Sequence, residues 1–506
     1  MPRVLPLNPD ILPDRLYTAE TVREIDRTAI QDYGIPGITL MRRAAAACVD
    51  AMTSWWPESH RVLVLCGGGN NAGDGYIIAG MLRERHYDVA VRFVGDTGKY
   101  SQDAQTARQY CIASGIDPLP FDVSAVPPAD VIVDALLGTG LNGDIRPDFA
   151  AAISAVNAAG ARVLAVDIPS GLCANTGNKL GDCVMADITM TFIGLKQGMF
   201  TLNGPDACGQ LLFDSLGVPD GILEQAGHQV RKLNQADPQY LPGKRPRNSH
   251  KNQFGHVLVI GGDVGMGGAV MLAAEAAMRC GAGLVSVATH PDHVVALLAR
   301  RPEIMARGIK STSELDALLR KASVLVLGPG LGHSEWSQMV YDHVMEKCEL
   351  PLVIDADALG LLAAKPVKRA NRILTPHPGE ALTLLKACSD DPETVDIAAD
   401  RFAAVKQLQH CYGGVSILKG AGTLIADEQG VTLCPYGNPG MSVAGMGDVL
   451  SGVIGALLAQ GLPLTLAAQQ GVMCHALAGD QAAKDGERGL MATDLLPHLR
   501  QLLNRE

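Results

Sequence analysis

The sequence is poor in charge and in aromatic residues, and it has no long apolar run. Of its 506 residues, 19% are charged and 4% are aromatic, and 42 basic against 53 acidic residues give a formal net charge of −11. An acidic chain is poorly suited to bind nucleic acid or an anionic membrane surface, so we expect neither partner. No apolar segment is long enough to span a membrane, and residues 1–10 lack the apolar core of a signal peptide.

The twelve cysteines are scattered and form no Cys-x-x-Cys pair. In a long chain without an export signal, this pattern indicates reduced thiols rather than a disulfide framework, and it favours the cytoplasm. Hydrophobic residues make up 47% of the sequence, which is enough for sizeable cores. The length suggests two or three domains.

Short apolar strands alternate with helices in both halves of the chain, which is typical of largely parallel sheets with crossover helices. Residues 18–60 are expected to be helical, with Thr18 and Thr21 as alternative N-terminal caps. The strands expected in the first half are residues 62–66, 89–94, 131–133, 163–166, 188–192 and 211–213. Those in the second half are residues 256–260, 284–288, 324–327, 352–354, 373–374, 415–418 and 423–426, and residues 269–279 are the clearest helix.

A proline-rich region lies between the two halves. Pro219, Pro238, Pro242 and Pro246 are expected to interrupt any regular element there. The basic run of residues 243–251 is either a solvated linker or a loop that reaches a ligand phosphate. We predict two α/β domains, residues 1–225 and residues 226–506.

Three turns in the first half carry polar side chains directly after predicted strands. They contain Asn70, Asn71 and Asp74, then Asp134, and then Asp167 and Ser170. Ligands of parallel sheets bind beyond the carboxyl ends of the strands, so these groups are expected to converge. Neutral and anionic oxygen atoms together suit a hard cation, whose identity the residues leave open. Taken singly, each aspartate is more often a loop cap.

Together, Asn70–Gly75, Asp134–Gly140 and Asp167–Gly171 resemble the NAD(P)H-hydrate epimerase domain, over about residues 15–217. The resemblance implies a Rossmann-like three-layer α/β/α fold and a potassium ion held by Asn71, Asp134 and Ser170. It implies that the hydrated nucleotide contacts Asn70, Asn71, Ala72, Gly73, Asp74, Gly138, Thr139, Gly140, Leu141, Asn142, Gly143, Asp144 and Asp167. Epimerisation at C6 of the hydrated ring needs a carboxylate as acid–base group, and we predict Asp167 for this role.

The chain departs from the epimerase pattern at three positions. Ala72 stands where Gly is commoner, and Arg42 and Ala45 stand where Glu and Gly are usual. These departures concern helix packing and contacts between subunits more than the site.

The second half is organised around the segment from Asn438 to Gly452. Small residues lead up to Gly445 and Gly447, Asp448 follows, and an apolar helix is expected after it. Free N–H groups and the helix dipole attract an anion at a helix N-terminus. Asp448 can take a proton beside that anion, and the two features together favour phosphoryl transfer. A capping aspartate after a glycine loop is the simpler alternative.

Four more loops, at residues 261–269, 328–332, 375–380 and 419–423, follow predicted strands. Each has a plain structural explanation: His377 as a turn residue, Glu380 as a helix cap, and residues 419–423 as a hairpin turn. Asp355 and Asp357 also follow a strand, and for them we favour capping of the next helix over cation binding.

Together with Asp448, these loops resemble the carbohydrate-kinase-like dehydratase domain of the ribokinase-like superfamily, over about residues 235–502. Met446 replaces a commoner Thr or Ala. The resemblance assigns the hydrated dinucleotide to Gly267, Gly330, His377 and Asp448, with Asp448 as catalytic base. It assigns the adenine nucleotide to Lys419, Gly420, Ala421, Gly422, Thr423 and Gly447, with Mg²⁺ on the phosphates. The preference for ADP over ATP follows by analogy with fused bacterial-type members.

We therefore predict a bifunctional metabolite-repair enzyme. The first domain would interconvert the R and S forms of hydrated NAD(P)H, and the second would dehydrate the S form with ADP, giving NAD(P)H, AMP and phosphate. The alternative is a ribokinase-like kinase of a small alcohol with a regulatory or scaffold N-terminal domain. We expect small-molecule substrates and a homo-oligomer.

Overall fold

The computed structural model describes residues 9–141, 143–228, 230–236 and 243–504. The chain divides into two compact units, of which the first ends at Arg231 and the second begins at Lys232. Helix α7 (Asp220–Ala226) runs across the position predicted for the boundary, and Pro219 caps this helix at its start instead of interrupting it. A proline lacks the N–H that the start of a helix leaves unpaired, so it is tolerated there. Pro238 and Pro242 lie outside the described residues.

The first unit is built on a sheet of seven parallel strands in the order β4-β3-β2-β5-β6-β7-β9. The strands are β2 (Arg61–Cys66), β3 (Asp88–Phe93), β4 (Leu119–Pro120), β5 (Val131–Ala135), β6 (Arg162–Val166), β7 (Ile188–Phe192) and β9 (Gln210–Asp214). The order reverses between β2 and β5, and such a reversal opens a crevice at the carboxyl ends of the strands.

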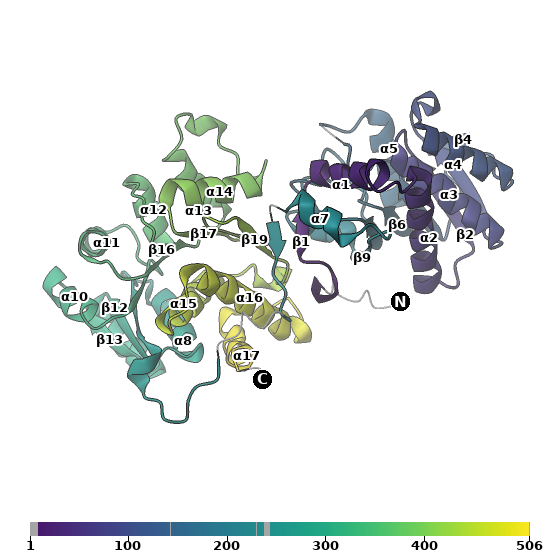
Figure 1. Cartoon of the computed structure of the whole chain (residues 1–506). Coiled ribbons are helices and arrows are strands. Elements are labelled where there is room, and N and C mark those ends of the chain that lie inside the picture. Colours follow the sequence, from purple (N-terminus) through teal and green to yellow (C-terminus); the bar gives the residue numbers. More distant parts are fainter. Residues whose placement is uncertain (1–8, 142, 229, 237–242, 505–506) are drawn as a thin grey trace. The chain divides into compact units, whose positions relative to one another are not determined.

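Helices cover both faces of this sheet (Figure 1). α2 (Gly37–Trp55), α3 (Asn70–Glu84) and α4 (Gln102–Ala113) pack together over one apolar core, and α5 (Pro147–Ala158) packs over the other. The first helix, α1 (Ala19–Gln31), is capped by Thr18, whose hydroxyl accepts a hydrogen bond from the backbone N–H of Thr21. The predicted helical stretch is two helices, because Gly34 has a φ of +67° and Pro36 begins α2.

Several short strands were not predicted. They are β1 (Arg15–Tyr17), β4, β8 (Leu195–Lys196), β10 (Val230–Lys232), β13 (Met305–Gly308) and β19 (Val431–Cys434). Within the first unit, β1 pairs in parallel with β8 and antiparallel with residues 230–231 of β10. This arrangement holds residues 15–17 beside β8, which carries the buried side chain of Lys196.

The second unit contains strands in the order β13-β12-β11-β14-β15-β16-β17-β18-β19. Pairing is parallel up to β17 and antiparallel in β18 and β19. The strands not yet given are β11 (His256–Ile260), β12 (Leu284–Thr289), β14 (Val324–Leu327), β15 (Leu352–Ile354), β16 (Arg372–Leu374), β17 (Val415–Leu418) and β18 (Thr423–Ala426). Together with the first unit, this confirms the predicted α/β class.

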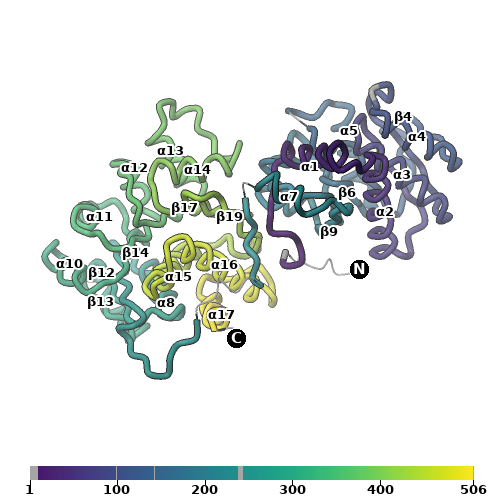
Figure 2. The backbone as a smooth tube through the Cα atoms, viewed as in Figure 1, coloured from purple at the N-terminus to yellow at the C-terminus, as the bar shows by residue number. Residues whose placement is uncertain are grey.

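The last helices of the chain fold back beside the first helix of the second unit (Figure 2). α8 (Gly267–Arg279) packs against α15 (Met446–Ala459) and α17 (Leu495–Leu502), and α16 (Leu464–Ala482) packs against α15 and α17. A Cβ atom at Gly452 would lie 2.1 Å from the carbonyl oxygen of Ala273, so glycine permits the close approach of α15 to α8. The middles of these two helices therefore lie side by side.

The remaining helices of the second unit follow one another in contact. They are α9 (Val294–Arg300), α10 (Thr312–Leu319), α11 (Glu335–Lys347), α12 (Asp357–Ala364), α13 (Pro378–Lys386) and α14 (Arg401–Tyr412), and α10 to α14 form a continuous row. None of the twelve cysteines, all of which lie in the described part of the chain, forms a disulfide, as predicted. In the described part of the chain, no helix combines the length and the apolar character needed to cross a membrane.

Candidate functional sites

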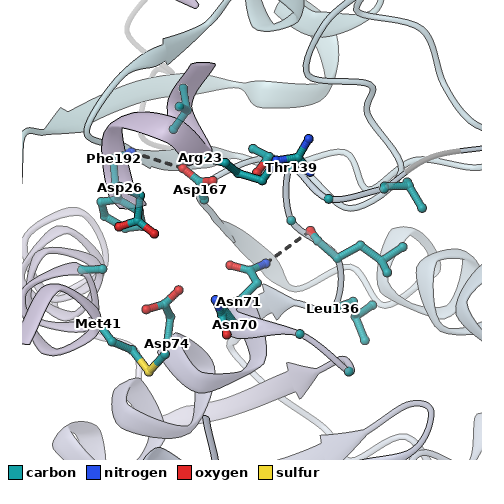
Figure 3. A pocket seen from close by; sticks show the side chains of 18 of the residues that line it. Arg23, Asp26, Met41, Asn70, Asn71, Asp74, Leu136, Thr139, Asp167 and Phe192 are labelled. Carbon is teal, nitrogen blue, oxygen red and sulfur yellow. Dashed lines mark hydrogen bonds between the residues drawn. The ribbon is translucent and has the colours of Figure 1, made fainter. Parts of the chain in front are cut away.

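A cavity of about 720 Å³ opens in the first unit where β2, β5 and β6 end (Figure 3). The predicted residues that line it are Asn70, Asn71, Asp74, Gly138, Thr139, Gly140, Leu141, Asp144 and Asp167. Ala72 is buried within α3, Gly73 packs against Met41, and Gly143 lies outside the lining. Asn142 lies outside the described residues. The structure therefore brings the three predicted turns together at one edge of the sheet.

Asp134 and Ser170 form a buried polar cluster beneath this cavity. Asp134 Oδ1 accepts hydrogen bonds from Ser170 Oγ (2.6 Å) and Leu136 N (3.2 Å), and its Oδ2 accepts one from Ser170 N (2.8 Å). Burial raises the pKa of Asp134 to about 6, against the lowering effect of these hydrogen bonds. Asn71 donates from Nδ2 to the carbonyl oxygen of Leu137 (3.2 Å), whereas its buried Oδ1 has no partner in the structure. A buried amide oxygen without a partner is costly, and a bound cation would satisfy it.

Asp167 is held by a lysine that the sequence analysis did not single out. Lys196 has a fully buried side chain, and its Nζ donates hydrogen bonds to Asp167 Oδ1, to Thr191 Oγ1 (2.8 Å) and to the carbonyl oxygen of Phe192 (3.2 Å). Asp167 itself has a φ of +67°, which is rare for a residue with a side chain. Lys196 is the only charged residue between Asp187 and Asp206. A single charge in such an apolar stretch could have been used to predict that Lys196 has a functional role.

Two charged residues of α1, Arg23 and Asp26, also line the cavity and were not predicted. Burial, followed by the negative charge of Asp167, raises the pKa of Asp26. Because α1 precedes the first strand of the main sheet, no rule about the ends of strands would point to these residues.

In the second unit, the predicted loops follow the carboxyl ends of neighbouring parallel strands, and Lys419 joins two of them. Its Nζ lies 3.2 Å from Asp355 Oδ1 and 3.8 Å from Glu380 Oε2. Asp355 follows β15, Glu380 lies in α13 after β16, and Lys419 follows β17. A Cβ atom at Gly447 would lie 3.2 Å from Lys419 Nζ. These contacts place the start of α15 beside the ends of three strands.

Asp448 lies in the first turn of α15, three residues after Gly445, which has a φ of +91° and forms the N-cap. Burial raises the pKa of Asp448 to about 7, and the nearby carboxylates of Asp355, Asp357 and Glu380 add to this effect, whereas Lys419 opposes it. A pKa near neutrality suits a group that takes up a proton. Of the other predicted glycines, Gly267 opens α8 beside the ring of His293, and Gly330, with a φ of +57°, lies against Met266.

His377 and Glu380 form a reciprocal cap at the start of α13. His377 Nδ1 accepts hydrogen bonds from Gly379 N (3.0 Å) and Glu380 N (3.3 Å), and Glu380 Oε2 accepts one from His377 N (2.7 Å). The expected capping by Glu380 is confirmed. The capping expected of Asp355 and Asp357 was wrong, because α12 has no side-chain cap, Asp355 pairs with Lys419, and Asp357 accepts a hydrogen bond from Gly332 N.

The loop of residues 419–422 connects β17 and β18, so the predicted hairpin turn is confirmed. Its backbone is held by Arg401, a fully buried residue that was not predicted. Arg401 donates hydrogen bonds to the carbonyl oxygens of Leu418 (3.2 Å), Lys419 (3.1 Å), Ala421 and Gly422 (3.2 Å). Burial lowers the pKa of Arg401 to about 10, which still leaves it charged at neutral pH. With its carbonyls held by Arg401, the loop keeps one backbone conformation.

Both halves of the chain match families of known proteins. Residues 257–501 match the family described as NAD(P)H-hydrate dehydratase, and residues 37–198 match the family described as YjeF-related protein N-terminus. The chain is 46% identical to the bifunctional NAD(P)H-hydrate repair enzyme Nnr of Coxiella burnetii over 97% of this chain and 99% of that protein. It is 41% identical to the enzyme of the same name from Escherichia coli, over 99% and 96%. A solved ribokinase-like superfamily protein from Enterococcus faecalis is 30% identical, with a TM-score of 0.50, over 54% of this chain and 95% of that one.

Proposed function

Because the chain belongs to the family of bifunctional NAD(P)H-hydrate repair enzymes, we propose that its two units perform two consecutive reactions. The first unit, which ends at Arg231, interconverts the R and S forms of hydrated NADH or NADPH. The second unit dehydrates the S form at the expense of ADP and releases NAD(P)H, AMP and phosphate. A single dehydratase pocket accepts one epimer, so the epimerase makes the whole pool of hydrate repairable.

The cavity of the first unit is the proposed epimerase site. It supplies backbone and amide donors from the turn after β2, and its volume of about 720 Å³ is in the range of pockets that hold small ligands. Asp167 is the acid–base group proposed for C6, because its carboxylate lines the cavity and a buried ammonium fixes its position. The residues from Gly138 to Asp144 border the same space and are proposed to contact the nucleotide.

Asn71, Asp134 and Ser170 fit a potassium ion. Asn71 Oδ1 is buried and has no hydrogen-bond partner among the described residues. Asn71 and Ser170 both donate to the carbonyl oxygen of Leu137, and Ser170 also donates to the fully buried Asp134. These oxygen ligands suit a hard monovalent cation. When bound, the ion would supply positive charge that orients oxygen atoms of the substrate.

Asp448 is the proposed base of the dehydratase, and the N-terminus of α15 is the proposed anion hole. Asp448 takes the proton of the C6 hydroxyl, and the oxygen attacks the terminal phosphorus of ADP, whose bond to the bridging oxygen breaks to release AMP. The ring nitrogen then forms a double bond to C6 as the C6–O bond breaks and phosphate departs. Loss of the C5 proton restores dihydronicotinamide. The backbone N–H groups of the turn stabilise the charge in transit.

The loop of Lys419 to Thr423 and Gly447 are proposed to hold the adenine nucleotide, and Gly267, Gly330 and His377 the hydrated dinucleotide. The buried Oδ2 of Asp355 has no partner and lies beside Glu380 and Asp448, so this site offers oxygen atoms that fit Mg²⁺. When bound with the nucleotide, Mg²⁺ would neutralise charge on the phosphate oxygens. The use of ADP in preference to ATP is part of the proposal.

The observation that carries the dehydratase assignment is the position of Asp448, half-buried at a helix N-terminus beside Lys419. The test follows the return of dihydronicotinamide absorbance when purified protein is given a mixture of hydrate epimers with ADP, with ATP or with neither. Complete conversion with ADP supports both activities. Conversion that stops at the initial S fraction would contradict the epimerase activity. A stable phosphorylated product would favour the kinase alternative.

The cytoplasmic location and the homo-oligomer remain predictions. The lack of disulfides among the twelve cysteines, all in the described residues, supports the first of them.

A further inference from the structure

Three aspartates from separate elements face the epimerase cavity. Asp26 lies on α1, Asp74 lies near the start of α3, and Asp167 follows β6. Figure 3 shows their carboxylates around a common space, across from Asn71. In water all three would be ionised at neutral pH. In the cavity their surroundings differ, and this difference separates a proton donor from a proton acceptor.

Asp167 forms an ion pair with a buried lysine. Lys196 donates to its Oδ1, and the same ammonium is fixed by Thr191 and by the backbone of Phe192. Within the described part of the chain, this is the only ion pair made by any of the three aspartates. The buried ammonium fixes the position of this carboxylate and offsets its negative charge. This contact makes Asp167 the candidate proton acceptor among the three aspartates.

Asp74 has the opposite surroundings. It is half-buried at the cavity wall, and its carboxylate has no ion pair or hydrogen bond in the described residues. Burial, followed by the charges of Asp167 and Asp26, raises its pKa well above the ordinary value. A buried carboxylic acid that has other acidic groups nearby and no cation of its own tends to keep its proton, and Asp74 is in this position.

The other titratable groups near Asp74 do not offset this effect. Burial raises the pKa values of the Cys48 thiol on α2 and the Cys66 thiol on β2 well above the usual range, so both stay neutral. Arg23 on α1 lies at the cavity wall, but it pairs with Glu20 on the exposed side of that helix (3.2 Å). Lys196 is bonded to Asp167.

We propose that Asp74 is the carboxylic acid that protonates the C6 hydroxyl during epimerisation, and that Asp167 is the partner base. The assignment rests on the epimerase function proposed above and adds a second catalytic residue to it. Asp74 gives its proton to the hydroxyl oxygen, the C6–O bond breaks to release water, and the ring nitrogen supplies the electron pair for a double bond to C6. Water then adds to the other face of C6 and gives its proton to Asp167. Exchange with solvent returns both groups to their starting forms.

The negative charge of the cavity fits this sequence of steps. The ring carries a positive charge after water leaves, and the acidic residue Asp167 lines the same cavity and can stabilise it. Asp26 adds a further acidic group, which helps to keep the proton on Asp74.

The test uses the full chain with Asp74→Asn, which keeps the size of the side chain and removes the acid. Interconversion of purified R and S hydrates is followed by chromatography without nucleotide, across pH 5.5–9. We expect a loss of about 100-fold or more, in the range of general acid catalysis. In the unchanged protein the rate should fall as pH rises and Asp74 loses its proton, and the residual rate of the variant should lack this fall.

Two controls separate chemistry from folding. Asp50→Asn removes an exposed carboxylate of the same unit, paired with Arg85, and should epimerise at the normal rate. Asp74→Ala should regain activity when formate is added, because a small acid can occupy the vacated space, whereas a misfolded unit would not respond. Asp74→Asn activity within about threefold of normal, or Asp74→Ala that formate does not restore, would overturn the assignment. Absence of epimerisation in the unchanged protein would instead reject the proposed function itself.

Discussion

Lys419 Nζ lies 3.2 Å from Asp355 Oδ1, and this ion pair ties the end of β17 to the end of β15. Burial alone would lower the pKa of Lys419, but the carboxylates of Asp355 and Glu380 outweigh it and raise the pKa. The second unit therefore has a permanent positive charge among four acidic residues, Asp355, Asp357, Glu380 and Asp448. The acidity of Asp448 depends on this balance, because Lys419 lowers its pKa and the other acids raise it.

Asp448→Asn should abolish dehydration and leave epimerisation unchanged. The substitution removes the base but keeps the first turn of α15, so we expect a loss of about 100-fold or more in the ADP-dependent rate. In the unchanged protein, with a pKa of about 7 for Asp448, dehydration should slow as pH falls below 7, because the base becomes protonated, and should level off above it. Initial rates of absorbance return between pH 5.5 and 8.5 measure this profile. If the variant still catalysed dehydration, Asp448 would not be the base.

Lys419→Met should move the acid side of that profile to higher pH, since the charge that lowers the pKa of Asp448 is lost. It also leaves the buried carboxylate of Asp355 without its cation, which is expected to destabilise the second unit by about 3 kcal/mol. Lys365→Met is the matched control, because Lys365 forms an exposed pair with Asp342 (3.1 Å), and such pairs contribute about 1 kcal/mol or less. Denaturant unfolding and the pH profile are the two measurements. An unshifted profile would contradict the proposed coupling.

Arg401→Met should weaken ADP binding, although Arg401 is not among the residues proposed to contact the nucleotide. Four backbone carbonyls of residues 418–422 lose their donor, so the loop loses its fixed conformation, and we expect the KM for ADP to rise about tenfold or more. Arg372→Met is the matched control. Arg372 is equally buried and donates to the carbonyl oxygens of Tyr412 (3.1 Å) and Val367, away from this loop.

Both arginine variants should lose stability, but only Arg401→Met should change the KM for ADP. The initial rate of dehydration measured against ADP concentration distinguishes them. A similar change in KM for both would show that the effect comes from general loosening of the unit and not from the loop.

The sequence was most informative where a strand ends. Asp134, Asp167, Lys419 and the Gly445–Asp448 turn all follow or adjoin apolar segments that are recognisable without a structure, and the structure places them at the carboxyl edges of the two sheets. The reason is physical: a buried parallel strand is largely an apolar run, and a polar or glycine-rich segment marks the region where it ends.

Residues that reach a site from an element far away in the sequence were not predicted in this way. Asp26 reaches the cavity from α1, and Arg401 reaches the hairpin from α14. Their roles depend on packing between elements, which no local period encodes. The same limit explains the wrong expectation for Asp355: capping is a local rule, but its partner Lys419 lies sixty-four residues later.

Asp134→Ala should impair epimerisation alone and remove its dependence on potassium. Asp134 accepts hydrogen bonds from the loops after β5 and β6, so its loss removes both a ligand of the proposed ion and the link between the two loops. Epimerisation of the unchanged protein should be faster in KCl than in the same concentration of choline chloride, and the variant should be slow in both. Asp122→Ala, which removes an exposed carboxylate hydrogen-bonded to Ser124 N (2.9 Å), is the control and should respond to potassium normally. ADP-dependent dehydration of the S epimer, measured on the same samples, should be equal in all three proteins. If Asp134→Ala epimerised at the normal rate, or still responded to potassium, the cation would have to bind elsewhere.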